Sequence, residues 1–371
     1  MRLASFNVEN LFDRPRAMGR DLGDRSAVLL QAHADLNAML EHDVYTDRLK
    51  TAILERLRVL RLLGSDAATY AVLRQIRGRL LRRSKSGGTT VVAGGRGDWI
   101  GWVELTTEAI SEVALRNTIR VITDVNPDVM AVVEAESRVA LKRFLDAGFA
   151  ELPVGSRFGH VMVIDGNDDR GIDVGIVSKP DYPIESVRSH VDDVDAYGRV
   201  FSRDSPEYTI RMPSGRRLVV IVCHLKSKGY GGQAASNATR LRQATRTAEI
   251  YRRLRAERVS WVAVVGDFND TPASAPLEPL LQHTDLRDIS QHPAFVADVR
   301  PGTYGNATAS EKIDYVLLSP QLFERVRGGG VNRMGVWGGV NGDLFPHYPT
   351  ITRPSQAASD HAAIFADLDT D

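Results

Sequence analysis

The chain has 371 residues, of which 43% are apolar and 25% are charged, and its formal net charge at pH 7 is zero. This composition is typical of a globular protein with a sizeable core, and the balanced charge excludes attraction to a polyanion through overall charge alone. The single cysteine, Cys223, excludes an intrachain disulfide and a cysteine-based zinc cluster. We expect Cys223 to be a buried apolar residue.

No apolar run reaches the ~18 residues of a membrane span, and the N-terminus lacks the basic and apolar leader of a secreted protein. We therefore expect a cytoplasmic protein with no membrane partner. No obligate protein partner is evident from the sequence.

Short apolar runs bounded by Gly, Pro, Asn or Asp recur along the chain and predict buried strands. In chain order they are Arg2–Phe6, Val129–Val133, Asp173–Val177, Leu218–Cys223, Trp261–Val265, Tyr315–Leu318 and Ala362–Leu368. Ser111–Val125 and Ala235–Glu257 carry apolar residues at helical spacing, so we expect helices there. Strands mixed with helices, with few clean βαβ repeats, indicate sheets packed face to face with helices outside.

A basic segment from about Gly19 to Glu108 interrupts the strand pattern. We predict that it is a helical insertion within a single domain of residues 1–371, followed by a glycine-rich loop at its end. Between Arg48 and Lys85 there are eleven Arg or Lys and two acids. Six cations are candidates for contacts with a nucleic-acid backbone, although such a run is more often a solvated helix face: Arg74, Arg77, Arg79, Arg82, Arg83 and Lys85.

Polar residues suited to metal or phosphate chemistry fall where the predicted strands begin or end: Asn7, Glu134, His224, Asp267, Asn269, Asp314, Asp360 and His361. In antiparallel neighbours the end of one strand lies beside the start of the next, so these residues can share one rim. Clustered carboxylates are costly unless a cation is bound, and oxygen ligands suit Mg²⁺, Mn²⁺ or Ca²⁺ better than zinc. Each residue also has an ordinary structural alternative, such as an Asx turn at Asp267 or a core histidine at His224.

Seven segments resemble the successive signature blocks of the endonuclease/exonuclease/phosphatase (DNase I-like) superfamily, in the family's order: SFNVENLFD, DVMAVVEAES, RGIDVGIV, CHLKSKG, GDFND, KIDYVLLS and SDHAAIFADL. The pairing of NVENLFD with HLKSKG and GDFND is most similar to the bacterial nuclease-like branch. The resemblance implies a four-layer α/β/β/α sandwich of two mainly antiparallel sheets, with Mg²⁺ (or Mn²⁺, with Ca²⁺ as a further option) as cofactor.

The resemblance assigns the metal site to three residues. Glu134 matches the metal-binding glutamate, Asn7 matches the amide that helps to hold metal or phosphate, and Asp360 matches an acid that contributes to the metal site.

Five further residues match catalytic positions of the family. Asp267 matches the aspartate that activates or orients the attacking water, and Asn269 matches the residue that stabilises the pentacovalent phosphorus. His361 matches the histidine that contacts the scissile phosphate and is oriented by Asp314. His224 matches a second phosphate-contacting histidine, which would protonate the leaving oxygen.

Four cations are weaker candidates for binding flanking phosphates: Arg170, Lys226, Lys228 and Arg240. The lysines lie in a glycine-containing loop that is equally consistent with a solvated surface. Trp337, Phe345, His347 and Tyr348 belong to a long Gly- and Pro-rich segment that either shapes a substrate cleft or packs as a surface loop.

These observations predict a divalent-metal-dependent phosphodiester hydrolase, most simply a nuclease that acts on DNA or RNA by in-line attack of water. The alternative is a phosphatase or phosphodiesterase of a small molecule or lipid headgroup. A silent binding module is disfavoured because the catalytic set is complete. An abasic-site repair enzyme is disfavoured because RPGTYGNATASE replaces the Trp- and Arg-containing stretch of that branch.

Overall fold

The structure is a computed structural model that describes residues 1–9, 24–84, 88–106, 112–168, 171–228, 232–298 and 300–371. The chain divides into two units, which we call the main unit (Met1–Phe12 and Ile110–Asp371) and the inserted unit (Asp13–Ala109). Among the described residues, no helix is both long enough and apolar enough to cross a membrane.

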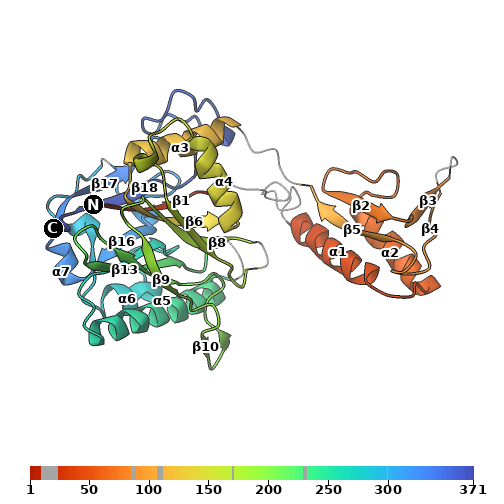
Figure 1. Cartoon of the computed structure of the whole chain (residues 1–371), viewed down its shortest axis with the longest axis horizontal. Helices are drawn as coiled ribbons and strands as arrows, with labels where there is room; N and C mark the ends of the chain where they lie inside the picture. The colour runs from red at the N-terminus through yellow and green to blue at the C-terminus, as the bar shows by residue number, and fades with distance from the viewer. Residues whose placement is uncertain (10–23, 85–87, 107–111, 169–170, 229–231, 299) are drawn as a thin grey trace. The chain divides into compact units, whose positions relative to one another are not determined.

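Two six-stranded sheets form the centre of the main unit (Figure 1). The first has the order β17-β18-β1-β6-β8-β7, with β1 at Arg2–Asn7, β6 at Val129–Ala135, β7 at His160–Ile164, β8 at Asp173–Ser178, β17 at Val326–Asn332 and β18 at Ala363–Leu368. The second has the order β15-β16-β14-β13-β12-β9, with β9 at Ile184–Arg188, β12 at Glu207–Arg211, β13 at Arg217–His224, β14 at Val262–Asp267, β15 at Arg287–Asp288 and β16 at Asp314–Leu318. A hairpin of β10 (Val194–Asp195) and β11 (Gly198–Arg199) stands apart from both sheets. All seven predicted strands are confirmed.

Strands buried on both faces explain the continuous apolar runs in the sequence. In β6, Val129, Ala131 and Val133 face a core shared with the second sheet, whereas Met130 and Val132 face a core shared with the helices outside the first sheet. The strands of the second sheet divide in the same way between the central core and an outer core under a helix.

Helices cover the outer face of each sheet. α3 (Glu112–Val125) and α4 (Arg138–Gly148) cover the first, while α5 (Gln233–Ala256) and α6 (Glu278–Leu281) cover the second (Figure 1). A short helix, α7 (Pro320–Phe323), precedes β17. The predicted order of α, β, β and α layers is therefore observed, and Cys223 is buried beneath α5 as expected.

The inserted unit contains two helices, α1 (Asp24–Leu40) and α2 (Asp47–Val59), and four strands, β2 (Ala71–Arg77), β3 (Leu81–Arg83), β4 (Thr89–Val91) and β5 (Ile100–Leu105). The prediction of a helical insertion was wrong for this second part, where β2 pairs with β5 and β3 with β4. In β2 the buried Ala71 and Leu73 alternate with Val72 and the exposed Arg74. This is the two-residue period of a strand, which the prediction overlooked because it rested on the number of charged residues.

We predicted one domain over residues 1–371. The inserted unit has a hydrophobic core of its own, which includes Leu36, Ile53, Leu73 and Trp99, and the number of domains stays a prediction.

Candidate active site

The pairing of the strands brings the predicted catalytic residues to one rim of the main unit. Asn7 lies opposite Val133 across the parallel pair β1 and β6. His224 lies opposite Asp267 across the parallel pair β13 and β14, and Asp267 lies opposite Asp314 across the antiparallel pair β14 and β16. Strands from both sheets therefore contribute to the same site.

Glu134 reaches the rim through a β-bulge. The alternation along β6 would direct its side chain toward the helical layer, but the register with β8 shifts between Val133 and Ala135, and Glu134 has φ = 67°. A non-glycine residue in the left-handed region is uncommon and costs free energy. The bulge changes the direction of the side chain, so that its carboxylate lies beside Asn7.

Close approach of two backbones fixes the position of Asp267. A Cβ atom on the preceding Gly266, which has φ = 135°, would lie 1.9 Å from the carbonyl oxygen of Cys223, so only glycine fits there. After Asp267 the chain turns at Asn269 (φ = 55°), whose backbone N–H donates a hydrogen bond to Asp267 Oδ1 over 2.8 Å. The predicted Asx turn and the predicted catalytic position thus coincide.

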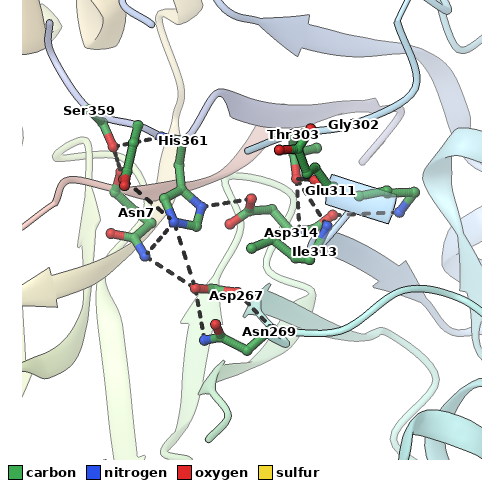
Figure 2. Close-up of polar contacts among 12 residues, drawn as sticks. Asn7, Asp267, Asn269, Gly302, Thr303, Glu311, Ile313, Asp314, Ser359 and His361 are labelled. Carbon is green, nitrogen blue, oxygen red and sulfur yellow. Dashed lines mark hydrogen bonds and ion pairs between the residues drawn. The ribbon is translucent and has the colours of Figure 1, made fainter. Parts of the chain in front are cut away.

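One carboxylate oxygen, Asp267 Oδ2, lies at the centre of the site (Figure 2). The side-chain amides of Asn269 and Asn7 donate to it over 3.0 and 3.2 Å. Nε2 of His224 and Nε2 of His361 lie 3.6 and 3.9 Å from the same oxygen. Two amides and two imidazoles from both sheets therefore surround a single buried oxygen.

His361 and the acids complete the constellation. His361 Nδ1 lies 2.9 Å from Asp314 Oδ2, and its Nε2 lies 3.7 Å from Asp360 Oδ1. Glu134 Oε1 accepts a hydrogen bond from the Asn7 amide over 3.3 Å and lies 3.8 Å from His224 Nε2. The structure thus brings together all eight residues that the sequence selected, and their individual roles stay predictions.

The electrostatics of the site follow from burial and from the density of carboxylates. Burial, together with the nearby carboxylates of Asp314 and Glu134, raises the pKa of Asp267 to about 7, against the opposing effect of His361. Burial lowers the pKa of His361, but Asp314, Asp267 and Asp360 outweigh burial, so that this pKa lies well above 6.5. The site therefore pairs an imidazolium with a carboxyl group that titrates near neutral pH.

A hard divalent cation fits this set of donors. Glu134, Asp360 and Asp267 offer carboxylate oxygens, and the raised pKa of Asp267 signals negative charge that a cation would compensate. Among the described residues, the ligand atoms that lie within 4.8 Å of one another belong to Asp267, Asp314 and His361. This grouping differs from the predicted ligands Asn7, Glu134 and Asp360, and Asn7 directs its NH₂ group, not its oxygen, at the carboxylates.

Two hydroxyl groups that sequence reasoning missed hold the site together. Thr303 Oγ1 accepts hydrogen bonds from the backbone N–H groups of Ile313 and Asp314 over 3.2 and 3.0 Å (Figure 2). The carbonyl oxygen of Thr303 accepts a hydrogen bond from the backbone N–H of Ala362, the residue after His361. Ser359 Oγ donates to the Asn7 carbonyl over 2.7 Å and accepts from the His361 N–H over 3.0 Å. Ser359 is the first residue of the block SDHAAIFADL, and Thr303 lies in the stretch RPGTYGNATASE that directly precedes the block KIDYVLLS.

The four candidate cations for flanking phosphates have different outcomes. Arg240 is fully buried and donates to Asp270, Asn237 and the carbonyl of Lys226, so its prediction as a substrate contact was wrong, and it supports the loop instead. Lys228 is half-exposed and pairs with Asp270 over 2.7 Å, and Lys226 is partly buried beside it. Arg170 lies outside the described residues.

The long segment before His361 contributes mainly to packing. Tyr348 is buried, and its hydroxyl donates to Asp124 of α3 over 2.6 Å. Trp337 stacks on His347 with ring centres 5.4 Å apart and contacts the core beneath α3, and Phe345 is also buried. These contacts favour the packed-loop alternative.

Comparisons with known proteins agree with this geometry. The sequence profile of the Endonuclease/Exonuclease/phosphatase family matches residues 105–322, more than half of the chain and outside most of the inserted unit. The matched stretch contains five of the site residues: Glu134, His224, Asp267, Asn269 and Asp314. No curated protein matches the chain significantly.

Solved structures share the fold at low sequence identity. A mannosyl-6-phosphatase of Bacteroides thetaiotaomicron VPI-5482 has a TM-score of 0.50 and 15% identity, covering 69% of this chain and 90% of its own. The human Nocturnin catalytic domain with bound sulfate has a TM-score of 0.50 and 16% identity, covering 71% and 88%. The chain belongs to the endonuclease/exonuclease/phosphatase family, whose members hydrolyse phosphate esters.

Proposed function

We propose that the protein is a divalent-metal-dependent phosphodiesterase that cleaves DNA or RNA by in-line attack of water. The observation that carries the proposal is the environment of Asp267 Oδ2, with amide donors at 3.0 and 3.2 Å and imidazole nitrogens at 3.6 and 3.9 Å. Such an arrangement places a base, hydrogen-bond donors and a cationic ring around one small volume, which is what an anionic phosphate requires.

Asp267 is the base in this proposal. The side-chain amides of Asn7 and Asn269 hold its carboxylate in the centre of the site, where it is placed to accept a proton from water. Asp267 takes a proton from water as the new oxygen–phosphorus bond forms, and the bond to the leaving oxygen breaks on the opposite side of phosphorus.

The other side chains neutralise and orient the phosphate. The His361 imidazolium, held by Asp314 over 2.9 Å, contacts a phosphate oxygen, and Asn269 donates to another as negative charge develops. His224 begins in its protonated form and gives its own ring proton to the leaving oxygen, while the water proton stays on Asp267. A divalent cation held by Glu134 and Asp360, with Asn7 beside it, would further neutralise the phosphate.

We favour nucleic acid as substrate because of the nuclease-like motifs and the basic inserted unit. Over residues 67–97 the chain carries seven Arg or Lys and no acid. This local positive charge attracts a polyanion although the net charge of the whole chain is zero. The competing substrate class is a small phosphate ester, the class to which the mannosyl-6-phosphatase relative points.

A substrate panel tests the proposal. The protein is incubated with plasmid, single-stranded DNA, RNA, an aryl phosphodiester and a sugar phosphate, with Mg²⁺ or Mn²⁺ and with EDTA. Metal-dependent cleavage of a polymer supports the proposal. Turnover of small esters alone moves the assignment to the competing class, and no metal-dependent turnover refutes both.

A further inference from the structure

The outward face of the sheet formed by β2 and β5 is a distinctive surface of the inserted unit. Residues directly opposite each other in an antiparallel pair share a face. Leu73 lies opposite Val103, and both are buried in the unit's core. Arg74 lies opposite Trp102, and both are exposed, so this pair occupies the outward face.

Large apolar groups are exposed on this part of the unit. Trp102 is 43% exposed, and Ile76, which adjoins a register shift in β2, is 69% exposed. Arg77 lies opposite Ile100, two positions from Trp102, and therefore shares the outward face with Trp102. All four tryptophans of the chain lie in the described residues, and Trp102 is the only exposed one.

The arginines of β2, of β3 and of the turn between these strands differ in how far their charge is neutralised. Arg74 pairs with Glu104, and Arg83 pairs with Asp66 and donates to the carbonyl of Leu63. Arg77, Arg79 and Arg82 are exposed, and within the described part of the chain they form no ion pair. Arg77 donates only a long hydrogen bond of 3.4 Å to the carbonyl of Gly97, so the charges of these three guanidinium groups are not neutralised by a neighbouring acid.

Aromatic rings with neighbouring cations are suited to single-stranded nucleic acid. Each base presents a flat face that stacks on an indole, while guanidinium groups contact the phosphates. A duplex hides its base faces within the stack, so it would use the cations but not the ring. An acidic protein segment would likewise leave Trp102 without a specific role.

We propose that this surface, consisting of Arg74, Arg77 and Trp102 and aided by the exposed Arg79 and Arg82 that follow β2 in the chain, binds single-stranded nucleic acid. The inference rests on the proposed function for the identity of the substrate and narrows it to a single strand. The base stacks on Trp102, and the arginines that form no ion pair contact the neighbouring phosphates.

Equilibrium binding by the full chain tests the proposal. Fluorescence anisotropy is measured with labelled oligothymidylate and with a duplex in EDTA, so that hydrolysis does not intervene, and poly-glutamate serves as a competitor. We expect oligothymidylate to bind more tightly than the duplex. Poly-glutamate should compete poorly at equal charge.

Variants separate stacking from charge. Trp102→Ala should weaken oligothymidylate binding about tenfold, whereas Trp102→Phe should retain most of it. The triple change Arg77→Gln, Arg79→Gln and Arg82→Gln should reduce the slope of log affinity against log salt by about 2. The matched control removes three exposed cations of α2 and the turn after it, Arg48→Gln, Arg58→Gln and Arg61→Gln, and should have little effect.

Any of four results would overturn the inference: unchanged binding in Trp102→Ala, equal losses in the two triple variants, preference for the duplex, or effective competition by poly-glutamate. Hydrolysis of an aryl phosphodiester is measured with the same variants. This small substrate needs the candidate active site but not the Trp102 surface, so the assay distinguishes the proposed function from the proposed binding surface. Polymer cleavage without binding by this surface would leave the proposed function standing, whereas binding without any polymer cleavage would leave the surface standing.

Discussion

Replacing Thr303 by valine is expected to loosen the site without removing any catalytic group. Valine has nearly the shape of threonine, but it leaves the N–H groups of Ile313 and Asp314 without their acceptor at 3.2 and 3.0 Å. An unsatisfied buried donor costs about 1–3 kcal/mol, so two donors cost roughly 2–4 kcal/mol if the loop relaxes in part. At a urea m-value of about 2 kcal/mol/M, the unfolding midpoint of the main unit should fall by about 1–2 M.

The site itself provides a second readout. Asp314 is the first residue of β16, and the hydrogen bonds to Thr303 hold this start of the strand. The carboxylate of Asp314 raises the pKa of His361. Displacement of Asp314 should therefore lower the pKa of His361, which NMR titration of its ring protons measures. Thr303→Ser retains the hydroxyl and should restore both properties, and Thr123→Val, on an exposed position of α3, controls for a generic loss of a hydroxyl.

If Thr303→Val unfolds like the wild type, the hydroxyl does not hold this strand start. If it is destabilised while the His361 pKa is unchanged, Thr303 is structural but does not position the Asp314–His361 pair.

Three further outcomes follow from the geometry. Asp267→Asn and His361→Ala should each lower turnover by about 10²–10⁴-fold with an unchanged circular dichroism spectrum, and near-normal activity would remove the role given to that residue. Adding Mg²⁺ or Mn²⁺ should raise the melting temperature of the wild type but not of Glu134→Gln, and equal shifts in both proteins would contradict a cation at Glu134. Burial raises the pKa of Asp173 from its ordinary 3.8 to about 6. The folded state therefore binds the proton of Asp173 more tightly than the unfolded state does. Ionised Asp173 should destabilise the fold progressively as the pH rises from about 4 to 6, and the full effect should be present above pH 6. Asp173→Asn retains the side-chain oxygen that accepts a hydrogen bond from the Gly166 N–H. The variant should therefore stabilise the protein by up to about 3 kcal/mol near pH 8 and by little near pH 4. Thermal melts at the two pH values measure this difference, and an equal effect at both would refute the explanation.

The main sheets were predictable because their residues obey strong local rules. Strands such as Val262–Asp267 are apolar throughout and end in a polar residue, so both their extent and the position of Asp267 could be predicted from the sequence. Burial on both faces leaves few alternatives for such a run.

The inserted unit was harder to predict because its strands are short and only half buried. Arg74 and Arg77 belong to β2, whose outward positions are free to be charged, and an arginine-rich run has no period that distinguishes an exposed strand face from a helix. Arg240 was predicted as a substrate contact because it follows the block CHLKSKG closely in the sequence. A cation near such a block can be buried in the structure, as Arg240 is, where it donates a hydrogen bond to Asp270.

Glu134 illustrates a further limit. Its identity as a strand-end acid was visible, but its left-handed φ of 67° and the bulge that directs it depend on the register with β8. Register is a tertiary property, so a single sequence predicts that the residue is near the rim without predicting how its side chain reaches the cluster.

The topology explains why an insertion is tolerated between two parts of one site. β1 and β6 are parallel neighbours, and parallel neighbours need a long crossover connection in any case. Extra residues between Asn7 and α3 lengthen that crossover without changing the pairing of either strand. Asn7 and His361, 354 positions apart in the sequence, therefore still meet at 3.4 Å, and an insertion at this point leaves the register of the strands around the candidate site unchanged.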